Sequence, residues 1–114
     1  MAKKNYEAPV CSLDYAFRRI GGKYKARVLW YIHSENNVLR YGELKRLIQN
    51  ITSKMLTQTL RELEEDKLIN RKVYPEVPPK VEYSLSKTGE ELIPFISHVG
   101  AWGRKQMEKE CEKQ

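Results

Sequence analysis

The sequence has few of the residues from which metal centres, cofactor sites and membrane spans are built. Its two cysteines and two histidines stand at no spacing that is typical of a zinc site. No glycine-rich phosphate loop occurs, and no stretch approaches the roughly 18 consecutive apolar residues of a transmembrane helix. We therefore expect neither a metal nor a cofactor, and no segment that spans a membrane.

Groups that could carry out catalysis are equally scarce. The candidates are Cys11, His33 and His98, and no two of them have the spacing of a nucleophile and its base. The first twelve residues, MAKKNYEAPVCS, contain lysines without an apolar run behind them, which argues against a secretory signal. We expect a cytoplasmic protein with reduced thiols that has no catalytic residues and is not an enzyme.

Acidic residues are also scarce in one half of the chain. Residues 1–61 hold twelve Lys and Arg against four Asp and Glu, whereas residues 62–114 hold nine against eleven. The 114 residues carry a net charge of +6 and have the length of a single domain, 1–114. A basic half favours a polyanionic partner, nucleic acid or an anionic membrane surface, although a solvated lysine-rich surface gives the same composition.

Hydrophobic periodicity predicts four helices in the first part of the chain. They cover residues 12–20, 23–35, 41–48 and 53–65. Ser12 is a plausible N-cap of the first helix, and Gly21 with Gly22 separates it from the second.

The helix over 53–65 has two unlike faces, with Thr52 or Ser53 as its N-cap. The helical period gathers apolar or small side chains on one face: Met55, Leu56, Thr59, Leu60 and Leu63. The opposite face carries Lys54, Thr57, Gln58 and Arg61. A polar face is most often only a solvated face, but these side chain types can also read the edges of DNA bases.

Two strand-like stretches follow, at residues 68–74 and 81–85, and the segment PEVPPK joins them. Its three prolines predict a hairpin with a stiff tip, flanked by the basic residues Arg71, Lys72 and Lys80. The chain from Lys87 onward is helical by composition, and Pro94 either bends that helix or restarts it. Its apolar residues are more than a lone terminal helix can cover, which predicts a dimer interface formed by Leu92, Phe95, Ile96, Val99 and Trp102.

Together these segments predict a winged helix-turn-helix, a mainly α fold with a small β-hairpin (α+β). We expect a core at about 21–85, with dimerisation elements at about 11–20 and 86–110. The residues expected to contact DNA are Arg40, Lys45, Ser53, Lys54, Thr57, Gln58, Arg61, Arg71, Lys72 and Lys80. Two plainer explanations stay open: Arg40 as a charge at a helix start, and the hairpin as a cover for the core.

Three strings carry a more specific resemblance. IGGKYKARVLWYI, LRYGELKRLIQNITSKMLTQTLRELEEDKLI and YPEVPPKVEYSLSKTGEEL, with a later Trp-Gly, resemble the HxlR-type family of bacterial winged-helix transcription regulators, which is close to MarR-type proteins. The resemblance runs from about Cys11 to Trp102. It implies a homodimer, formed by the N- and C-terminal helices, that binds a pseudo-palindromic operator in double-stranded DNA. Helix 53–65 would be the recognition helix, residues 71–83 the wing, and Arg40 and Lys45 would face the DNA backbone.

Two positions depart from the family pattern. Tyr24 stands where tryptophan is usual, a change that the core can absorb. Lys67 stands where a glycine normally ends the recognition helix. A non-glycine residue in the left-handed conformation costs about 1 kcal/mol, so we expect a differently shaped helix end.

Some family members sense oxidants or electrophiles with a cysteine at the place of Cys11. A thiol near a helix N-terminus, with Lys3, Lys4, Arg18 and Arg19 close in sequence, would have increased thiolate character. Ser12 replaces the proline that commonly follows this cysteine, and a partly buried, inert thiol is the alternative. Cys111 lies in a charged tail, where we expect no function.

The function predicted from the sequence is a sequence-specific DNA-binding transcription regulator. A homodimeric repressor that responds to thiol oxidation or electrophiles is the preferred form, and the small-molecule effector is left open. We expect no membrane partner. The alternative is a winged-helix module for protein or RNA contacts, whose binding to DNA would lack the steep salt dependence of phosphate contacts.

Overall fold

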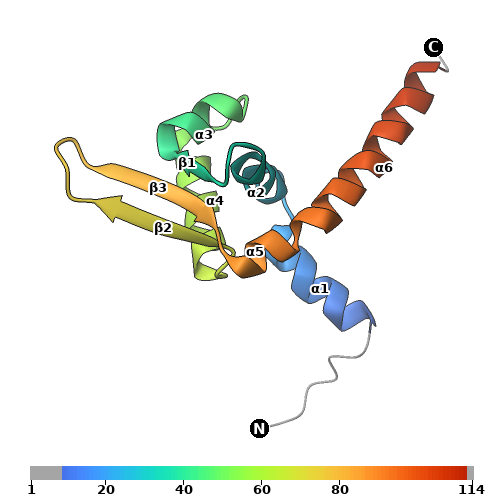
Figure 1. Ribbon diagram of the computed structural model, residues 1–114. Helices are drawn as coiled ribbons and strands as arrows, with labels where there is room; N and C mark the ends of the chain where they lie inside the picture. The colour runs from blue at the N-terminus through green and yellow to red at the C-terminus, as the bar shows by residue number, and fades with distance from the viewer. Residues whose placement is uncertain (1–8, 113–114) are drawn as a thin grey trace, which may run out of the picture.

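The computed structural model describes residues 9–112 and is mainly helical with a small antiparallel sheet (Figure 1). This confirms the predicted fold class. The elements in chain order are α1 (Pro9–Ile20), α2 (Lys25–Ser34), β1 (Val38–Arg40), α3 (Tyr41–Leu47), α4 (Ser53–Glu65), β2 (Ile69–Tyr74), β3 (Lys80–Leu85), α5 (Lys87–Glu91) and α6 (Ile93–Glu112).

The sheet has one strand more than the hairpin predicted from the sequence. Its order is β1-β3-β2, and both pairings are antiparallel, with Leu39 opposite Tyr83 and Val73 opposite Val81. The predicted hairpin of β2 and β3 is confirmed, and β1 is the strand that the sequence analysis missed. β1 has only three residues, which is too short for an alternating pattern to appear in the sequence.

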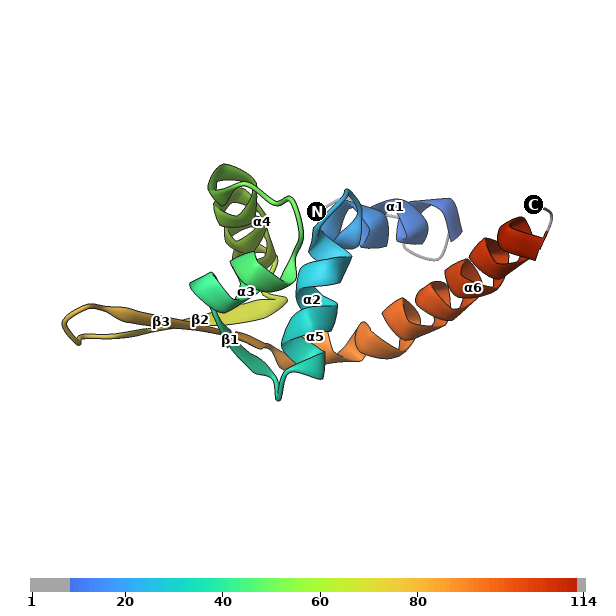
Figure 2. The ribbon, with the colours of Figure 1, turned by 90° about the horizontal axis from the view of Figure 1, so that it is seen from above.

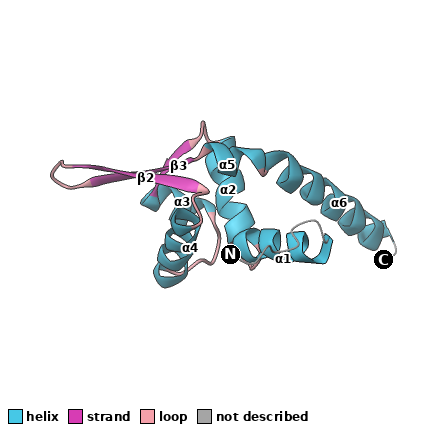
Figure 3. Cartoon of the chain, turned by 90° about the horizontal axis from the view of Figure 1, so that it is seen from below, coloured by secondary structure: helices cyan, strands magenta, loops and turns pink. Residues whose placement is uncertain are grey.

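One face of the sheet packs against helices, and the other is open. Figures 2 and 3 show α3 and α4 on the same side of the two long strands. Leu39, Tyr83 and Leu85 point to that side and join the core. The fully buried helical side chains of this core are Val28, Leu29, Ile32, Leu44, Leu56 and Leu63. Successive strand residues face opposite sides, so every second residue of β2 and β3 points to solvent.

The predicted bounds of α4 are confirmed, and Thr52 is its N-cap, because its side chain accepts a hydrogen bond from the Met55 N–H at 3.1 Å. Two other bounds were wrong. α1 begins at Pro9, so Ser12 lies inside the helix and does not cap it. α2 begins at Lys25, and Tyr24 precedes it as a buried core residue.

The end of α4 keeps a left-handed shape although glycine is absent. Lys67 has φ 61°, its N–H donates to the Glu64 carbonyl at 2.9 Å, and the Leu68 N–H donates to the Leu63 carbonyl at 3.0 Å. These two bonds form a Schellman motif, which satisfies the last carbonyls of the helix. The expectation of a differently shaped helix end was therefore wrong.

The C-terminal helical segment is divided in two. α5 ends at Glu91, and α6 restarts at Ile93 with Pro94 in its first turn, where a missing N–H costs nothing. Ser86 connects this segment to the end of α4, because its hydroxyl donates to the Lys67 carbonyl at 2.7 Å. Gly89 passes so close to the Leu68 carbonyl that a Cβ atom has no room there.

Two helices extend away from the winged core as arms (Figures 1 and 2). α1 and α6 leave the core in different directions, and they touch near their inner ends, where the Phe17 and Phe95 rings meet edge to face with centroids 6.3 Å apart. Exposed large apolar residues gather on these arms: Val10, Leu13, Tyr15, Phe17, Phe95, Val99, Trp102 and Met107.

Candidate nucleic-acid interface

The polar face of α4 is open to solvent as predicted. Lys54, Thr57, Gln58 and Arg61 are all exposed, and opposite them Leu56, Thr59, Leu60 and Leu63 are buried. Met55 was assigned to the buried face, and this was wrong, because 42% of its surface is exposed. It stands at the edge of the apolar face, beyond the reach of the core side chains.

The two cations of this face have no competing partner within the described residues. Neither Lys54 nor Arg61 makes a hydrogen bond or an ion pair with any residue from 9 to 112. Arginine can bind guanine O6 and N7 with two parallel hydrogen bonds, and lysine can bind phosphate or guanine. Both side chains can therefore bind a DNA groove or the DNA backbone without breaking a contact within the protein.

Thr57 is held by a residue that the sequence analysis did not single out. The Tyr41 hydroxyl at the start of α3 donates to the Ser53 carbonyl at 3.0 Å and lies 3.2 Å from the Thr57 hydroxyl. A phenol has one proton, so the Thr57 hydroxyl donates to Tyr41 in this arrangement. Tyr41 thereby joins the first turns of α3 and α4 and fixes one rotamer on the polar face.

The basic residues of α3 lie in different environments. Arg40 is exposed at the end of β1, and its N–H donates to the Glu43 carboxylate at 2.8 Å, which caps α3. Lys45 is partly buried, and its ammonium donates to the Ile51 carbonyl at 3.4 Å in the turn between the helices. Lys45 therefore supports the turn, whereas Arg40 and the exposed Arg46, which the sequence analysis missed, point charge to solvent.

The three basic wing residues do not lie on one face. Arg71 pairs with Tyr83 and so lies on the helix-covered side of the sheet, whereas Lys72 pairs with Glu82 on the open side. Lys80 shares that open side, because it pairs with Tyr74 and both lysine ammonium groups lie 4.8 Å from the Tyr74 ring centroid. The wing thus presents cations to both sides.

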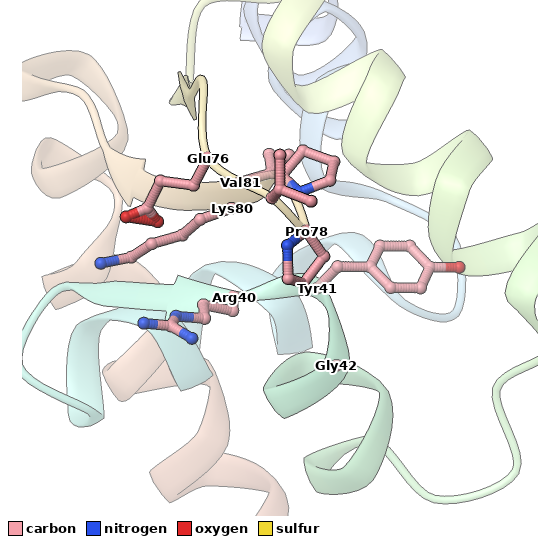
Figure 4. A pocket seen from close by; sticks show the side chains of 9 residues that line it. Arg40, Tyr41, Gly42, Glu76, Pro78, Lys80 and Val81 are labelled. Atoms are coloured by element: carbon pink, nitrogen blue, oxygen red, sulfur yellow. The ribbon is translucent and has the colours of Figure 1, made fainter.

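A hollow of about 710 Å³ separates the wing from the start of α3 (Figure 4). Arg40 at the end of β1 lines it together with Tyr41 and Gly42 at the start of α3, and residues 76–81 line it from the wing. In Figure 4 the charged ends of Arg40, Lys80 and Glu76 point to one side of the hollow, and the Tyr41 ring points to the other. Two cations from separate elements at one opening are an arrangement that suits a phosphate backbone.

Glu82 organises the charges on the open side of the wing. A hydrogen bond from the Tyr74 hydroxyl lowers the pKa of Glu82 from its ordinary value of 4.5, and the Lys80 and Arg40 charges lower it further. Lys80 lies 3.6 Å from this carboxylate. Glu82 therefore pairs with Lys80 of its own strand and is also influenced by the charge of Arg40 on β1, although the sequence analysis gave it no role.

The described residues contain no cluster of metal ligands, no helix that could span a membrane and no paired cysteines. Between residues 9 and 112 no group of three or more His, Cys, Asp and Glu side chains is placed to hold a metal ion, and no helix there is long and apolar enough to cross a membrane. Cys11 and Cys111 are free and exposed, so the alternative of a partly buried Cys11 is wrong. Lys3 and Lys4 lie outside the described residues.

The five residues predicted to form a dimer interface fall into two groups. Leu92 and Ile96 are partly buried against the core of their own chain. Phe95, Val99 and Trp102 are exposed along α6, with 42%, 47% and 64% of their surface open.

Comparison with known proteins places this geometry in a family. The model of the HxlR-like helix-turn-helix family matches residues 19–111. Similar relatives are the uncharacterized HTH-type transcriptional regulators YtcD and YkvN of Bacillus subtilis. YtcD is 50% identical over 103 residues, which is 90% of this chain and 78% of YtcD. YkvN is 48% identical over 100 residues, which is 88% of this chain and 83% of YkvN.

Solved structures of a related regulator have the same fold as this chain. The redox regulator HypR in its reduced form superposes with a TM-score of 0.80 at 37% identity, over 90% of this chain and 99% of HypR. The oxidized form of HypR superposes with a TM-score of 0.76 at 40% identity, over 83% of this chain and 96% of HypR. These proteins are transcription regulators and not enzymes, which confirms the expectation from the sequence. The chain therefore belongs to the HxlR-like helix-turn-helix family and is a DNA-binding transcription regulator of the HxlR and MarR type.

Proposed function

We propose that this regulator binds a pseudo-palindromic operator as a homodimer and represses transcription from it. The observation that carries the proposal is the exposed row on α4, in which Lys54 and Arg61 have no partner among residues 9–112. α4 would lie in the major groove, with Ser53, Lys54, Thr57, Gln58 and Arg61 toward the bases and nearby phosphates. Bases identify the site, and cations on the flanking elements fix the position of the protein.

The flanking cations come from three places around α4. Arg40 and Lys80 stand at the hollow between α3 and the wing, and Arg71 with Lys72 extends the charge along β2. We assign Arg40, Arg71, Lys72 and Lys80 to phosphates on either side of the groove. Lys45 contributes by holding the turn between the helices, where its ammonium meets the Ile51 carbonyl.

Dimerisation would use the two arms. The exposed apolar residues of α1 and α6 form the largest collection of such residues in the described chain, and a second copy would bury them. Phe95, Val99 and Trp102 would make the main contacts on α6. The arms at about 11–20 and 86–110 would then join two winged cores, 21–85, into one symmetric molecule whose site in DNA is also symmetric.

Cys11 would make this binding responsive to oxidation. It lies in the first turn of α1, and its side chain is exposed to reagents in solution. HypR, which this chain resembles, is described as a redox regulator. Two Cys11 thiols would lose two protons and pass two electrons to a disulfide reagent or diazene, and the new S–S bond would change the arrangement of the two arms.

The experiment is an anisotropy titration on the duplex directly upstream of the gene for this protein, in the cytoplasmic range of salt, with a shuffled duplex as the control. Tighter binding to the upstream duplex, with affinity that falls steeply as salt rises, supports the operator role. Equal binding to both duplexes or no salt dependence contradicts it and favours a protein- or RNA-binding module.

The same titration after treatment with diamide tests the thiol. Oxidation should weaken binding in the parent protein and leave Cys11→Ser unchanged, whereas Cys111→Ser should respond as the parent does. A Cys11→Ser protein that keeps the full oxidant response would contradict the assignment.

A further inference from the structure

One carboxylate on α4 is held at both of its oxygens by different partners. Gln58 Nε2 donates to Oε1 of Glu62 at 3.2 Å, and the ammonium of Lys25 lies 3.6 Å from Oε2 of the same group. Gln58 is on the exposed face of α4, whereas Lys25 is on α2. Glu62 therefore connects a candidate base-reading residue to the scaffold behind it.

The ammonium that holds Glu62 is itself fixed from a third element. Lys25 also donates to the Arg18 carbonyl at 3.2 Å, in the last turn of α1. Its side chain is only 16% exposed, against 40% for Glu62, so it is packed along most of its length. A contact that is built into the junction of α1 and α2 offers a firmer support than a flexible surface lysine would.

This arrangement decides the orientation of the Gln58 amide. An ionised carboxylate can only accept hydrogen bonds, so the amide nitrogen and not the oxygen must face Glu62. The carbonyl oxygen and the second N–H then point away from Glu62. An unrestrained glutamine can present either end of its amide to a base, whereas this one presents its donor and acceptor in a single order.

Other acidic residues of α4 do not have these contacts. Glu65 is exposed, and within the described residues it makes no hydrogen bond or ion pair. Residues four apart on a helix often pair, but such a pair stabilises the helix only weakly when neither side chain is held elsewhere. The contact from Lys25 distinguishes Glu62 from that ordinary case.

We propose that Glu62, held by Lys25, is a positioning residue that orients the Gln58 amide and thereby sets the base preference at one position of each operator half-site. The inference rests on the proposed function, because it presumes that α4 reads bases. Glu62 itself touches no base, and its effect is expected in specificity more than in affinity.

The test is selection of binding sites from a duplex library with a randomised segment, followed by affinity measurements on single-base variants of the selected site. Gln58→Ala identifies the half-site position that Gln58 reads. Glu62→Met keeps the length and helix propensity of the side chain but removes the acceptor. Glu65→Met is the matched control, since it removes the same charge three residues away.

Glu62→Met should lose discrimination at the position identified by Gln58→Ala, by about fivefold or more, because a well-placed contact of two hydrogen bonds supplies that much. Glu62→Gln keeps one acceptor oxygen and should restore part of the preference. Lys25→Met should relax the same position to a smaller extent. Glu65→Met should raise affinity for all duplexes and leave the preference unchanged.

A measurement without DNA tests the orientation directly. In the free protein, the NMR shifts of the two Gln58 side chain amide protons should change in Glu62→Met and stay in place in Glu65→Met. Circular dichroism of each variant checks that the total helix content is unchanged, and Glu62→Gln with Lys25→Met carries the test if Glu62→Met does not fold.

The outcomes separate this inference from the proposed function. If the parent selects a site and Glu62→Met discriminates as sharply as Glu65→Met, Glu62 has no positioning role although the operator function stands. If the parent itself selects no site, the operator function fails, and the inference fails with it.

Discussion

Within the segment from α2 to β3, a central set of apolar side chains is buried, and Val28, Leu29, Ile32 and Leu56 have no exposed surface. In the arms the same residue types are open to solvent, with Leu13 54% and Trp102 64% exposed. The two regions contain the same types of apolar residue. They differ in whether the chain itself supplies a partner surface.

The contrast shows two sources of stability. The winged core can gain its hydrophobic stabilisation within one chain, whereas the exposed apolar residues of the arms contribute only when another surface covers them.

The largest expected effect is on the core. Leu56→Ala should lower the free energy of unfolding by about 2–5 kcal/mol, because a fully buried leucine leaves a cavity. Leu13→Ala is the matched control in an arm and should cost less, since half of that side chain is already exposed. Urea unfolding at one protein concentration measures the free energy of unfolding of both variants. Equal decreases would show that the core and the arm do not differ in this respect.

The next effect concerns the arms. Trp102→Glu should weaken self-association by about 2–4 kcal/mol, the range for a central aromatic contact, while circular dichroism keeps its helical signal. Val77→Glu makes a comparable change at a fully exposed position in the wing and should leave the dimer intact. Sedimentation equilibrium measures the dissociation constant, and unchanged association in Trp102→Glu would show that α6 is not the interface.

A smaller effect separates base reading from backbone binding within the core. Arg61→Ala should weaken binding to the operator by about 1–3 kcal/mol and bind random DNA nearly as before. Neither the dimer nor the fold should change, because Arg61 has no partner among residues 9–112. Anisotropy titrations on both duplexes measure this, and equal losses on the two would mean that Arg61 contacts only phosphate.

Lys80→Ala provides the opposite pattern for comparison. It should weaken binding to specific and random DNA by similar factors and reduce the slope of log affinity against log salt by about 1.

The smallest expected effect is a change in the pKa of Glu82 in the wing. Tyr74→Phe removes the hydrogen bond that contributes most to the lowered pKa of Glu82, so that pKa should rise toward 4.5. A lowered pKa stabilises the fold above the unfolded value, and this contribution is lost as the pH falls below about 4.5 through the folded value. NMR titration of the Glu82 carboxyl carbon measures the shift, and an unmoved pKa would show that Tyr74 is not its main partner.

Much of the winged core could be predicted from the sequence, because the sequence signals that define its elements are local. The period of α4, its cap at Thr52 and the prolines of the wing each act within a few residues. β1 could not be predicted, because a three-residue strand exists only through its pairing with β3. Met55 was misplaced for a similar reason, since the helical period does not show where the core ends.

The sequence by itself determined which residue types stand on the exposed face of α4 and that the terminal helices carry more apolar surface than they can cover. Only the tertiary structure decided what holds those residues: Tyr41 at Thr57, and Lys25 with Glu62 at Gln58. The physical reason is distance along the chain. A helical face follows from spacings of three and four residues, whereas a contact between Lys25 and Glu62 requires the packing of α2 against α4.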